Sequence, residues 1–117
     1  MKLLCYTRHI MAKHKPKPIQ FSWDPAKAEK NDEKYGVSFD EAATVFKDPV
    51  AMYFDDVEHS QKEKREYVIG RSITRERLLT CVFERTEGGI RIISARISTH
   101  RERHDYDDNS EIEYQIQ

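Results

Sequence analysis

The feature that most constrains this chain is a series of three apolar runs joined by short turns in its second half. The runs cover residues 65–71, 77–84 and 90–97, and each has the length and β-branched content of a strand. The second connection contains Gly88 and Gly89, which suit a tight hairpin. Parallel neighbours would need a crossover of a dozen or more residues, so short turns require antiparallel pairing. The pattern predicts an antiparallel meander.

The first half of the chain predicts a strand, two helices and one further strand of the meander. Residues 19–23 alternate apolar and polar side chains, as a strand does. Asp24 and Pro25 then supply an N-cap and a first helical residue, and Gly36 is expected to end that helix in a left-handed conformation. A capping box at 38–41 opens a second helix, which ends before Pro49. Residues 50–54 form the fourth meander strand.

A second capping box, at 99–102, predicts a short helix towards Asp108. Helices segregated from an antiparallel meander make an α+β domain with two layers. We therefore expect an N-terminal strand and two helices, a four-stranded antiparallel meander and a C-terminal helix. A chain of 117 residues has the size of one domain. We assign 1–18 to a flexible basic leader, 19–108 to the domain and 109–117 to an acidic tail.

Charge and cysteine content narrow the class of protein. The first 20 residues carry five basic and no acidic residues, yet the whole chain has a formal net charge of −1. The domain itself is therefore acidic, and any contact with RNA must use a local basic cluster. The two cysteines lack the close spacing of a zinc site and form no disulfide framework. No apolar run has the length of a membrane span, so we expect a cytoplasmic protein.

The sequence contains no nucleophile elbow and no glycine-rich nucleotide loop. His100 and His104 are four residues apart on the last predicted helix, but no third metal ligand accompanies them. We therefore expect no metal and no cofactor. One alternative remains open, a metal-dependent nuclease that uses Asp55, Asp56 and His59.

Arginines within or at the ends of predicted strands are the main candidates for chemistry: Arg65, Arg71, Arg77, Arg91 and Arg96. A guanidinium group stays charged and binds phosphate with two parallel hydrogen bonds. Strict alternation places Arg91 and Arg96 on opposite sides of their strand unless a bulge intervenes. Arg96 is the stronger candidate because a strand end leaves its side chain free to reach a concave surface. The alternative is that these arginines are ordinary solvated side chains on an exposed sheet face.

An arginine cluster with one proton-transfer group is sufficient to cleave RNA. In attack by the 2′-hydroxyl, negative charge develops on the equatorial oxygens of the phosphorane. Preorganised cations at those oxygens contribute about 3–4 kcal/mol each, by analogy with oxyanion-hole donors. This chemistry needs no metal ion.

Several ordered motifs of the chain resemble the BrnT family of bacterial toxins. The likeness extends from about residue 21 to 108. It comprises WDPAKA (23–28), KYGVSF (34–39), EAA (41–43), VF (45–46), DP (48–49), IGRS (69–72), IRIISAR (90–96) and RER (101–103), together with Asn31, Arg65 and Tyr106.

The resemblance implies a RelE-like fold and a ribonuclease that arrests translation. It also implies a cognate BrnA-type antitoxin with a ribbon-helix-helix domain, through which the complex would contact operator DNA. Arg65 and Arg96 correspond to residues that support cleavage, and Tyr35 stands where the family more often has histidine. We add Tyr35 to the expected catalytic residues, and the expected substrate-binding residues are Lys34, Arg71, Arg77, Arg91, Arg103 and Tyr106.

Three interpretations stay open at the level of sequence. A free phenol titrates near pH 10, so Tyr35 is a poorer proton-transfer group than histidine at neutral pH. The chain could therefore be a degenerate toxin that acts only as antitoxin partner and operon co-repressor. Tyr106 could stack on a base or instead pack against the sheet. The acidic residues after Arg103 could be a solvated helix end or could contact basic residues of the antitoxin.

Overall fold

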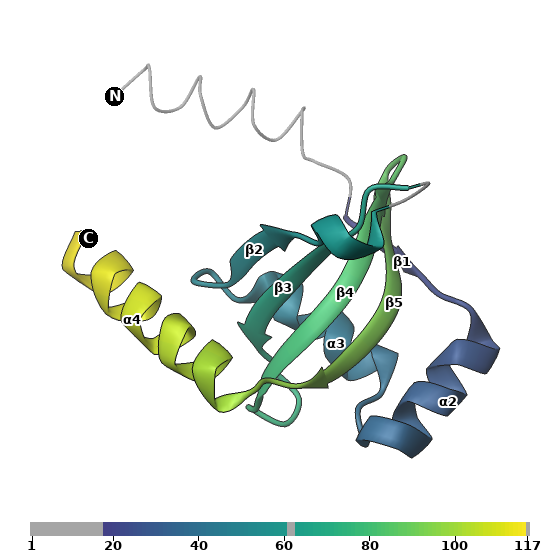
Figure 1. The fold of residues 1–117 in the computed structure, drawn as a ribbon, viewed down its shortest axis with the longest axis horizontal. Helices are drawn as coiled ribbons and strands as arrows, with labels where there is room; N and C mark the ends of the chain where they lie inside the picture. The colour runs from purple at the N-terminus through teal and green to yellow at the C-terminus, as the bar shows by residue number, and fades with distance from the viewer. Residues whose placement is uncertain (1–17, 61–62, 117) are drawn as a thin grey trace, which may run out of the picture.

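The computed structural model describes residues 18–60 and 63–116, so the predicted leader lies outside the described residues except for Pro18. These residues form three α-helices around one sheet (Figure 1). In order, the elements are β1 (Gln20–Ser22), α2 (Pro25–Tyr35), α3 (Phe39–Thr44), the 3₁₀ turn η1 (Val45–Lys47), β2 (Met52–Asp55), the 3₁₀ turn η2 (Val57–His59), β3 (Glu66–Arg71), β4 (Leu78–Thr86), β5 (Gly89–Ile97) and α4 (His100–Ile116).

The sheet has five strands in the order β1-β5-β4-β3-β2. Strands β2 to β5 form the predicted antiparallel meander. The sheet differs from the expected layout in that β1 joins the meander as a fifth strand, parallel to β5 at its edge, with Phe21 opposite Ile90. The intervening helices and meander supply the long connection that a parallel pair requires. Gly89 allows the close approach, since a Cβ at this position would overlap the carbonyl group of Gln20.

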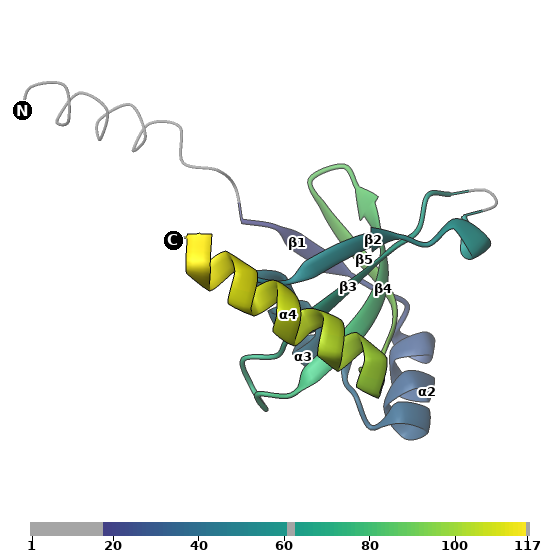
Figure 2. The same ribbon diagram turned by 60° about the vertical axis from the view of Figure 1, so that its left-hand side comes forward.

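Helices lie on both sides of the sheet, which corrects the expected two-layer arrangement. On one side, α3 and η1 bury Phe39, Ala42 and Val45 against the main core. On the other side, Tyr106 of α4 packs against Ile69 and Leu78 in a second cluster. Figure 2 shows α4 and α3 separated by the sheet. The smaller cluster exists because β3 and β4 are apolar on both faces near one end.

Local sequence signals set the helix ends as predicted. The Asp24 carboxylate accepts a hydrogen bond from the Ala26 N–H at 2.9 Å, and Pro25 is the first residue of α2. Gly36 ends the helix with a φ of 68°, the left-handed conformation that glycine adopts without strain. Ser38 caps α3 by accepting from the Glu41 N–H at 3.1 Å.

The C-terminal helix begins as predicted but is longer than expected. Thr99 and Glu102 form a reciprocal capping box, in which each side chain accepts from the other's N–H, at 3.2 and 2.8 Å. From His100 the helix continues to Ile116, through most of the segment expected to be a tail. In the described part of the chain, no helix combines the length and the apolar character of a membrane span.

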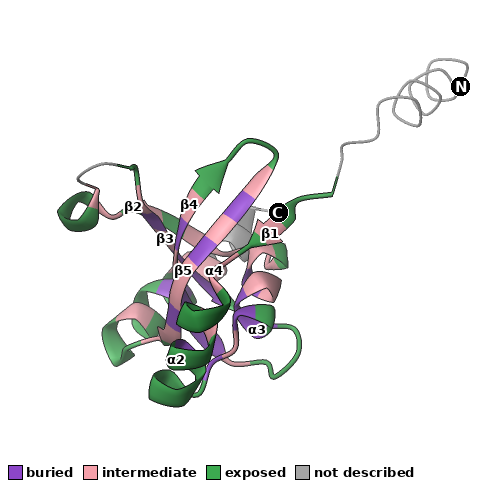
Figure 3. Ribbon diagram, turned by 90° about the vertical axis from the view of Figure 1, so that its right-hand side faces the viewer, coloured by how far each residue is buried: buried purple, intermediate pink, exposed green. Residues whose placement is uncertain are grey.

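Helix α2 covers the edge of β5 that the short β1 leaves unpaired. The side-chain amide of Asn31 donates to the Ala95 carbonyl at 2.8 Å and accepts from the Ala95 N–H at 3.1 Å. The same amide donates to the Val37 carbonyl at 2.9 Å. Asn31 thus pairs with β5 as a neighbouring strand would, and it is 6% exposed. Figure 3 shows α2 beside β5, with most of the helix exposed.

Candidate functional site

One face of β3, β4 and β5 is only partly covered, and we call it the open face. The strand register places Tyr67, Val82 and Ser94 side by side on it, with Glu84 opposite Arg91 and Thr80 opposite Arg96. The other face of the same strands carries the main core. Helix α4 packs against β3 and leaves much of β4 and β5 open on this side. Most side chains here are half-buried, so the surface is accessible to a ligand.

A β-bulge brings two of the predicted arginines to this face. Val82 pairs with Ser94 and Phe83 pairs with Ile92, so Ile93 is an extra residue in β5. The extra residue resets the alternation of side chains. Arg91 and Arg96, five residues apart, therefore both point to the open face.

Glu102 fixes the orientation of Arg96. Nη1 and Nη2 of Arg96 donate to the two carboxylate oxygens of Glu102 at 2.7 and 3.1 Å. Burial by itself would raise the pKa of Glu102, but hydrogen bonds from Arg96 and from the Thr99 N–H lower this pKa to about 2. The carboxylate in turn raises the pKa of the Arg96 guanidinium. The pair is charged on both sides throughout the physiological pH range.

Arg96 keeps one side of its guanidinium available. Among the described residues, none accepts a hydrogen bond from its Nε, and its side chain is 39% exposed. The phenol groups of Tyr35 and Tyr67 lie near enough to act on its pKa. Tyr35 ends α2 and is 41% exposed, whereas Tyr67 is half-buried and stacks on Phe54 with ring centroids 4.9 Å apart. Arg96 thus offers a half-exposed guanidinium with a free Nε, and two tyrosines lie in its neighbourhood.

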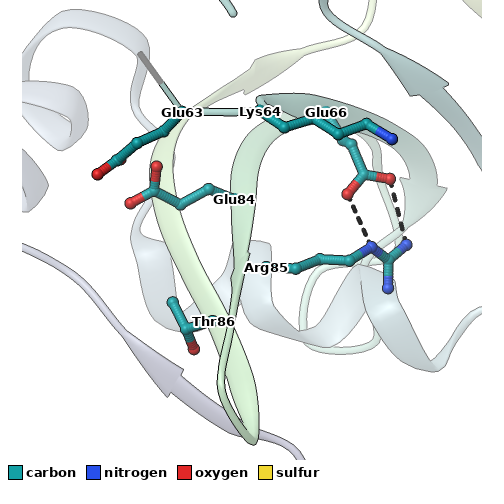
Figure 4. Close-up of a pocket in the computed structure, with 6 residues that line it drawn as sticks. All are labelled: Glu63, Lys64, Glu66, Glu84, Arg85 and Thr86. Carbon is teal, nitrogen blue, oxygen red and sulfur yellow. Dashed lines mark hydrogen bonds and ion pairs between the residues drawn. The ribbon is translucent and has the colours of Figure 1, made fainter.

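A second charged group lies further along the open face, around Glu84. Arg91 Nε lies 3.7 Å from the carboxylate of Glu84, and the charge of Arg65 also acts on this carboxyl. The facing carboxyl of Glu63, together with burial, raises the pKa of Glu84 despite the two arginines. Figure 4 shows the carboxyl groups of Glu63 and Glu84 turned towards each other, while Arg85 is held by Glu66 at 2.7 Å.

Arg65 and Arg96 lie on the same face of the sheet but far apart along the strands. Arg96 lies level with Thr80 and Ile69, and Arg65 precedes Ile69 by four residues. With about 3.3 Å per residue and about 4.8 Å between strands, their Cα atoms are about 16 Å apart. The two guanidinium groups are therefore better placed for neighbouring phosphates of one strand than for a single phosphate.

Two predicted substrate-binding residues have partners elsewhere in the fold. Arg77 donates to both oxygens of Glu41, at 2.6 and 2.8 Å, and to the Gly36 carbonyl at 2.8 Å, so it ties β4 to the helices on the core side. Tyr106 is 5% exposed, and its hydroxyl donates to Asp48 at 2.6 Å. Of the two alternatives for Tyr106, packing against the sheet is the one found.

The remaining predicted residues are exposed. Arg71 lies at the far end of β3, with its guanidinium 5.8 Å from the ring centroid of Tyr106. Arg103 lies on the surface of α4. Lys34 lies beside Tyr35, with its Nζ 5.1 Å from the centre of that ring.

The residues of the proposed metal-dependent alternative lie at the β2 end of the sheet. His59 Nδ1 is 3.0 Å from Asp56, and Asp55 pairs with Lys64 at 3.5 Å. Each carboxylate therefore already has a basic partner.

Sequence reasoning missed three residues that shape the open face: Tyr67, Glu84 and Glu102. Glu102 was recognised as a cap, but nothing in the sequence shows that the same carboxylate binds Arg96, because that contact depends on how α4 leaves β5. Tyr67 could have been found from alternation, since it shares its strand side with Arg71. Glu84 depends on the strand register.

Comparison with known proteins assigns the chain to a family. No curated protein matches the chain. A family model described as "Ribonuclease toxin, BrnT, of type II toxin-antitoxin system" matches residues 23–102, which include both helices of the N-terminal half, the whole meander and Glu102. The match covers more than half of the chain, so the protein belongs to the BrnT family of ribonuclease toxins of type II toxin–antitoxin systems.

Proposed function

We propose that the open face is the RNA-cleaving surface and that Arg96 binds the phosphate at which the chain is cut. The observation that supports this assignment is the arrangement of Arg96 itself. Glu102 holds one edge of its guanidinium, and among the described residues none accepts a hydrogen bond from its Nε, while its side chain is 39% exposed. A guanidinium in this state is preorganised and needs no rearrangement to receive phosphate oxygens.

The reaction is a metal-independent transesterification within the RNA. The 2′-oxygen attacks the adjacent phosphorus, the bond from phosphorus to the 5′-oxygen of the next nucleotide breaks, and the proton of the 2′-hydroxyl leaves to a base. Arg96 stabilises the charge that develops on the phosphorane, a contribution of about 3–4 kcal/mol. The Tyr35 hydroxyl donates a proton to the departing 5′-oxygen. The products are a 2′,3′-cyclic phosphate and a 5′-hydroxyl end.

The other basic residues of the open face bind the flanking RNA backbone. Arg65 and Arg91 lie about four residue pairs along the strands from Arg96, or about 13 Å, where the RNA backbone would continue beyond the cut phosphate. Lys34 lies beside Tyr35, with its Nζ over that ring. Arg71 and Arg103 are exposed and can add long-range attraction.

The physiological partner is a cognate antitoxin of the BrnA type, with a ribbon-helix-helix domain. A type II antitoxin is a protein that binds its toxin, and the family assignment supports its presence. Operator DNA would be contacted through the antitoxin.

The deciding experiment measures cleavage of RNA by the purified protein with and without EDTA. We expect cleavage in EDTA and products that carry a 2′,3′-cyclic phosphate. Arg96→Ala should lose about a hundredfold or more in kcat, whereas Arg101→Ala, an exposed arginine on α4, serves as a matched control. Cleavage that needs an added divalent ion, or 3′-hydroxyl products, would contradict the mechanism.

Substitution of Tyr35 tests whether the chain is an active or a degenerate toxin. Tyr35→Phe should reduce kcat because it removes the proposed proton donor. Tyr35→His should increase kcat near neutral pH, because imidazole transfers protons more readily there than a phenol. An inert wild-type protein that still binds antitoxin would favour the co-repressor role instead.

A further inference from the structure

We infer that a lysine-lined groove between α2 and the bulge of β5 binds the sugar–phosphate backbone of RNA beside the cleavage site. This inference rests on the proposed function, and it extends the substrate path from the open face onto a helix. It assigns a role to Lys27 and Lys30, which sequence reasoning did not select.

The groove is a shallow cavity of about 290 Å³. Its lining is unusual for an acidic domain, because half of it is lysine: Lys27, Lys30, Asn31, Lys34, Tyr35 and Ile93. Asn31 uses its side-chain amide to pair with β5 and Val37, so it forms the wall of the groove. The three lysines and the Tyr35 ring are left to contact a ligand.

Charge is segregated around α2. At about 100° per residue, Lys27, Lys30 and Lys34 fall within about 60° of one another on the helix surface. Glu29 and Asp32 lie on the opposite side, and Glu33 lies at the boundary, about 60° from Lys30. An ordinary solvated helix face would mix the two signs at i, i+4 spacing. The separation instead concentrates positive charge at the groove.

The lysines of the groove have no acidic partner within the described part of the chain. All three are exposed, and none forms an ion pair there. By contrast, Arg77, Arg85, Arg91 and Arg96 are each paired with a glutamate. Unpaired lysines can neutralise phosphates without first giving up a protein partner. Lysine also accepts many phosphate positions, because its ammonium group is a flexible point charge.

The groove is continuous with the open face. Ile93, the extra residue of the bulge, lines the groove and lies between Arg91 and Arg96 in β5. Tyr35 lines the groove and also acts on the pKa of Arg96. A strand of RNA held at Arg96 can therefore enter the groove directly, and the 41% exposed ring of Tyr35 offers a surface on which a base can stack.

The composition of the groove favours RNA over a protein segment. Stable protein–protein contacts are centred on buried aromatic or aliphatic anchors in pockets. Here the only apolar wall is Ile93 with the Tyr35 ring, and three ammonium groups surround it. Stacking plus cationic side chains is the usual means of holding single-stranded nucleic acid without sequence preference.

The test compares Lys27→Gln/Lys30→Gln with a matched control, Lys47→Gln/Arg101→Gln, which removes the same charge from exposed residues outside the groove that form no ion pair in the described part of the chain. The substrate is an RNA that the wild-type protein cleaves, assayed over a range of salt concentrations. We expect KM of the groove variant to rise about tenfold with kcat unchanged. The slope of log KM against log salt should fall by about 1.4, or about 0.7 for each lost phosphate contact. The control should match the wild type.

Binding of a 2′-O-methyl RNA of the same sequence separates this inference from the proposed cleavage. The methylated strand cannot react, so its affinity reports the groove even if the wild type proves inert. Equal affinity and equal salt slope in the groove variant and the wild type would overturn the groove assignment alone. The groove assignment would also be overturned if the variant lost affinity for purified antitoxin while its RNA binding stayed normal. The lysines would then form part of the antitoxin interface.

Discussion

Glu102 binds Arg96 through two parallel hydrogen bonds, of 2.7 and 3.1 Å, and with the same carboxylate caps the first turn of α4. The residue that orients the proposed phosphate-binding arginine therefore also determines where the last helix begins. Thr80 adds a third contact, because its hydroxyl donates to Glu102 at 3.0 Å. The start of α4 and the geometry of the open face are consequently coupled through one side chain.

Glu102→Gln should weaken both the fold and the site. The amide retains one acceptor oxygen but loses the charge and turns a donor towards Arg96, so the free energy of unfolding should fall by about 2 kcal/mol. Cleavage should fall as well, because Arg96 loses its fixed orientation. Urea unfolding and RNA cleavage measure the two effects. An unchanged kcat in the folded variant would show that Arg96 does not need Glu102 for orientation.

The pH dependence of stability provides an independent check on this pair. The folded-state pKa of Glu102 is about 2, below its ordinary value of 4.5. A depressed pKa means that the stabilisation is complete above about pH 5 and is lost as the pH falls from 4.5 towards 2. The difference in unfolding free energy between wild type and Glu102→Gln should be constant near neutral pH and shrink below pH 4.5. A difference that stays constant down to pH 2 would contradict the assignment.

Asn31→Ala should expose the edge of β5. The change leaves the Ala95 N–H, the Ala95 carbonyl and the Val37 carbonyl without their partner, at a cost of about 3 kcal/mol in the free energy of unfolding. Amide hydrogen exchange should accelerate at Ala95 more than in the centre of β4. Uniform loss of protection across the sheet would indicate a different role for Asn31.

Arg77→Ala should be among the most destabilising changes to any arginine of this protein. Glu41 is only 4% exposed, and without Arg77 its carboxylate would keep a single strong partner, the Ser72 hydroxyl at 2.8 Å. Breaking a buried pair by removing one member costs about 3–5 kcal/mol. Thermal unfolding measures the loss, and Arg77→Met/Glu41→Leu should recover much of it. If the double variant is no more stable than the single one, the buried charge is not the cause.

Gly89→Ala should detach β1 from the sheet without disrupting the meander. A methyl group at this position would overlap the Gln20 carbonyl, which belongs to the rigid backbone of β1. Amide exchange in the strand and fluorescence of Trp23, which follows it, report the change. Gly88→Ala is a useful contrast, because that position has open space but a φ of 80°. Its cost should come from backbone strain in the hairpin and should leave β1 paired.

Several elements were predictable from local chemistry alone. The caps at Asp24, Ser38 and Thr99 are confirmed because a cap depends only on residues within one turn of the chain. The meander was predictable because short connections leave neighbouring strands no alternative to antiparallel pairing. The position of β1 was not predictable, since its partner lies about 70 residues later in the chain and the pairing depends on the whole fold.

The candidate site, too, was predictable from the sequence only in part. The sequence by itself determined that arginines would lie on the strands, because residue type and alternation are local properties. Only the tertiary structure decided which of them meet. One extra residue, Ile93, turned Arg96 to the side of Arg91, and the ion pair with Glu41 drew Arg77 to the opposite side. A bulge shifts the register by one residue, so the side chains that follow it point to the other face of the sheet. The position of the bulge is fixed by packing across strands and not by the residues that form it.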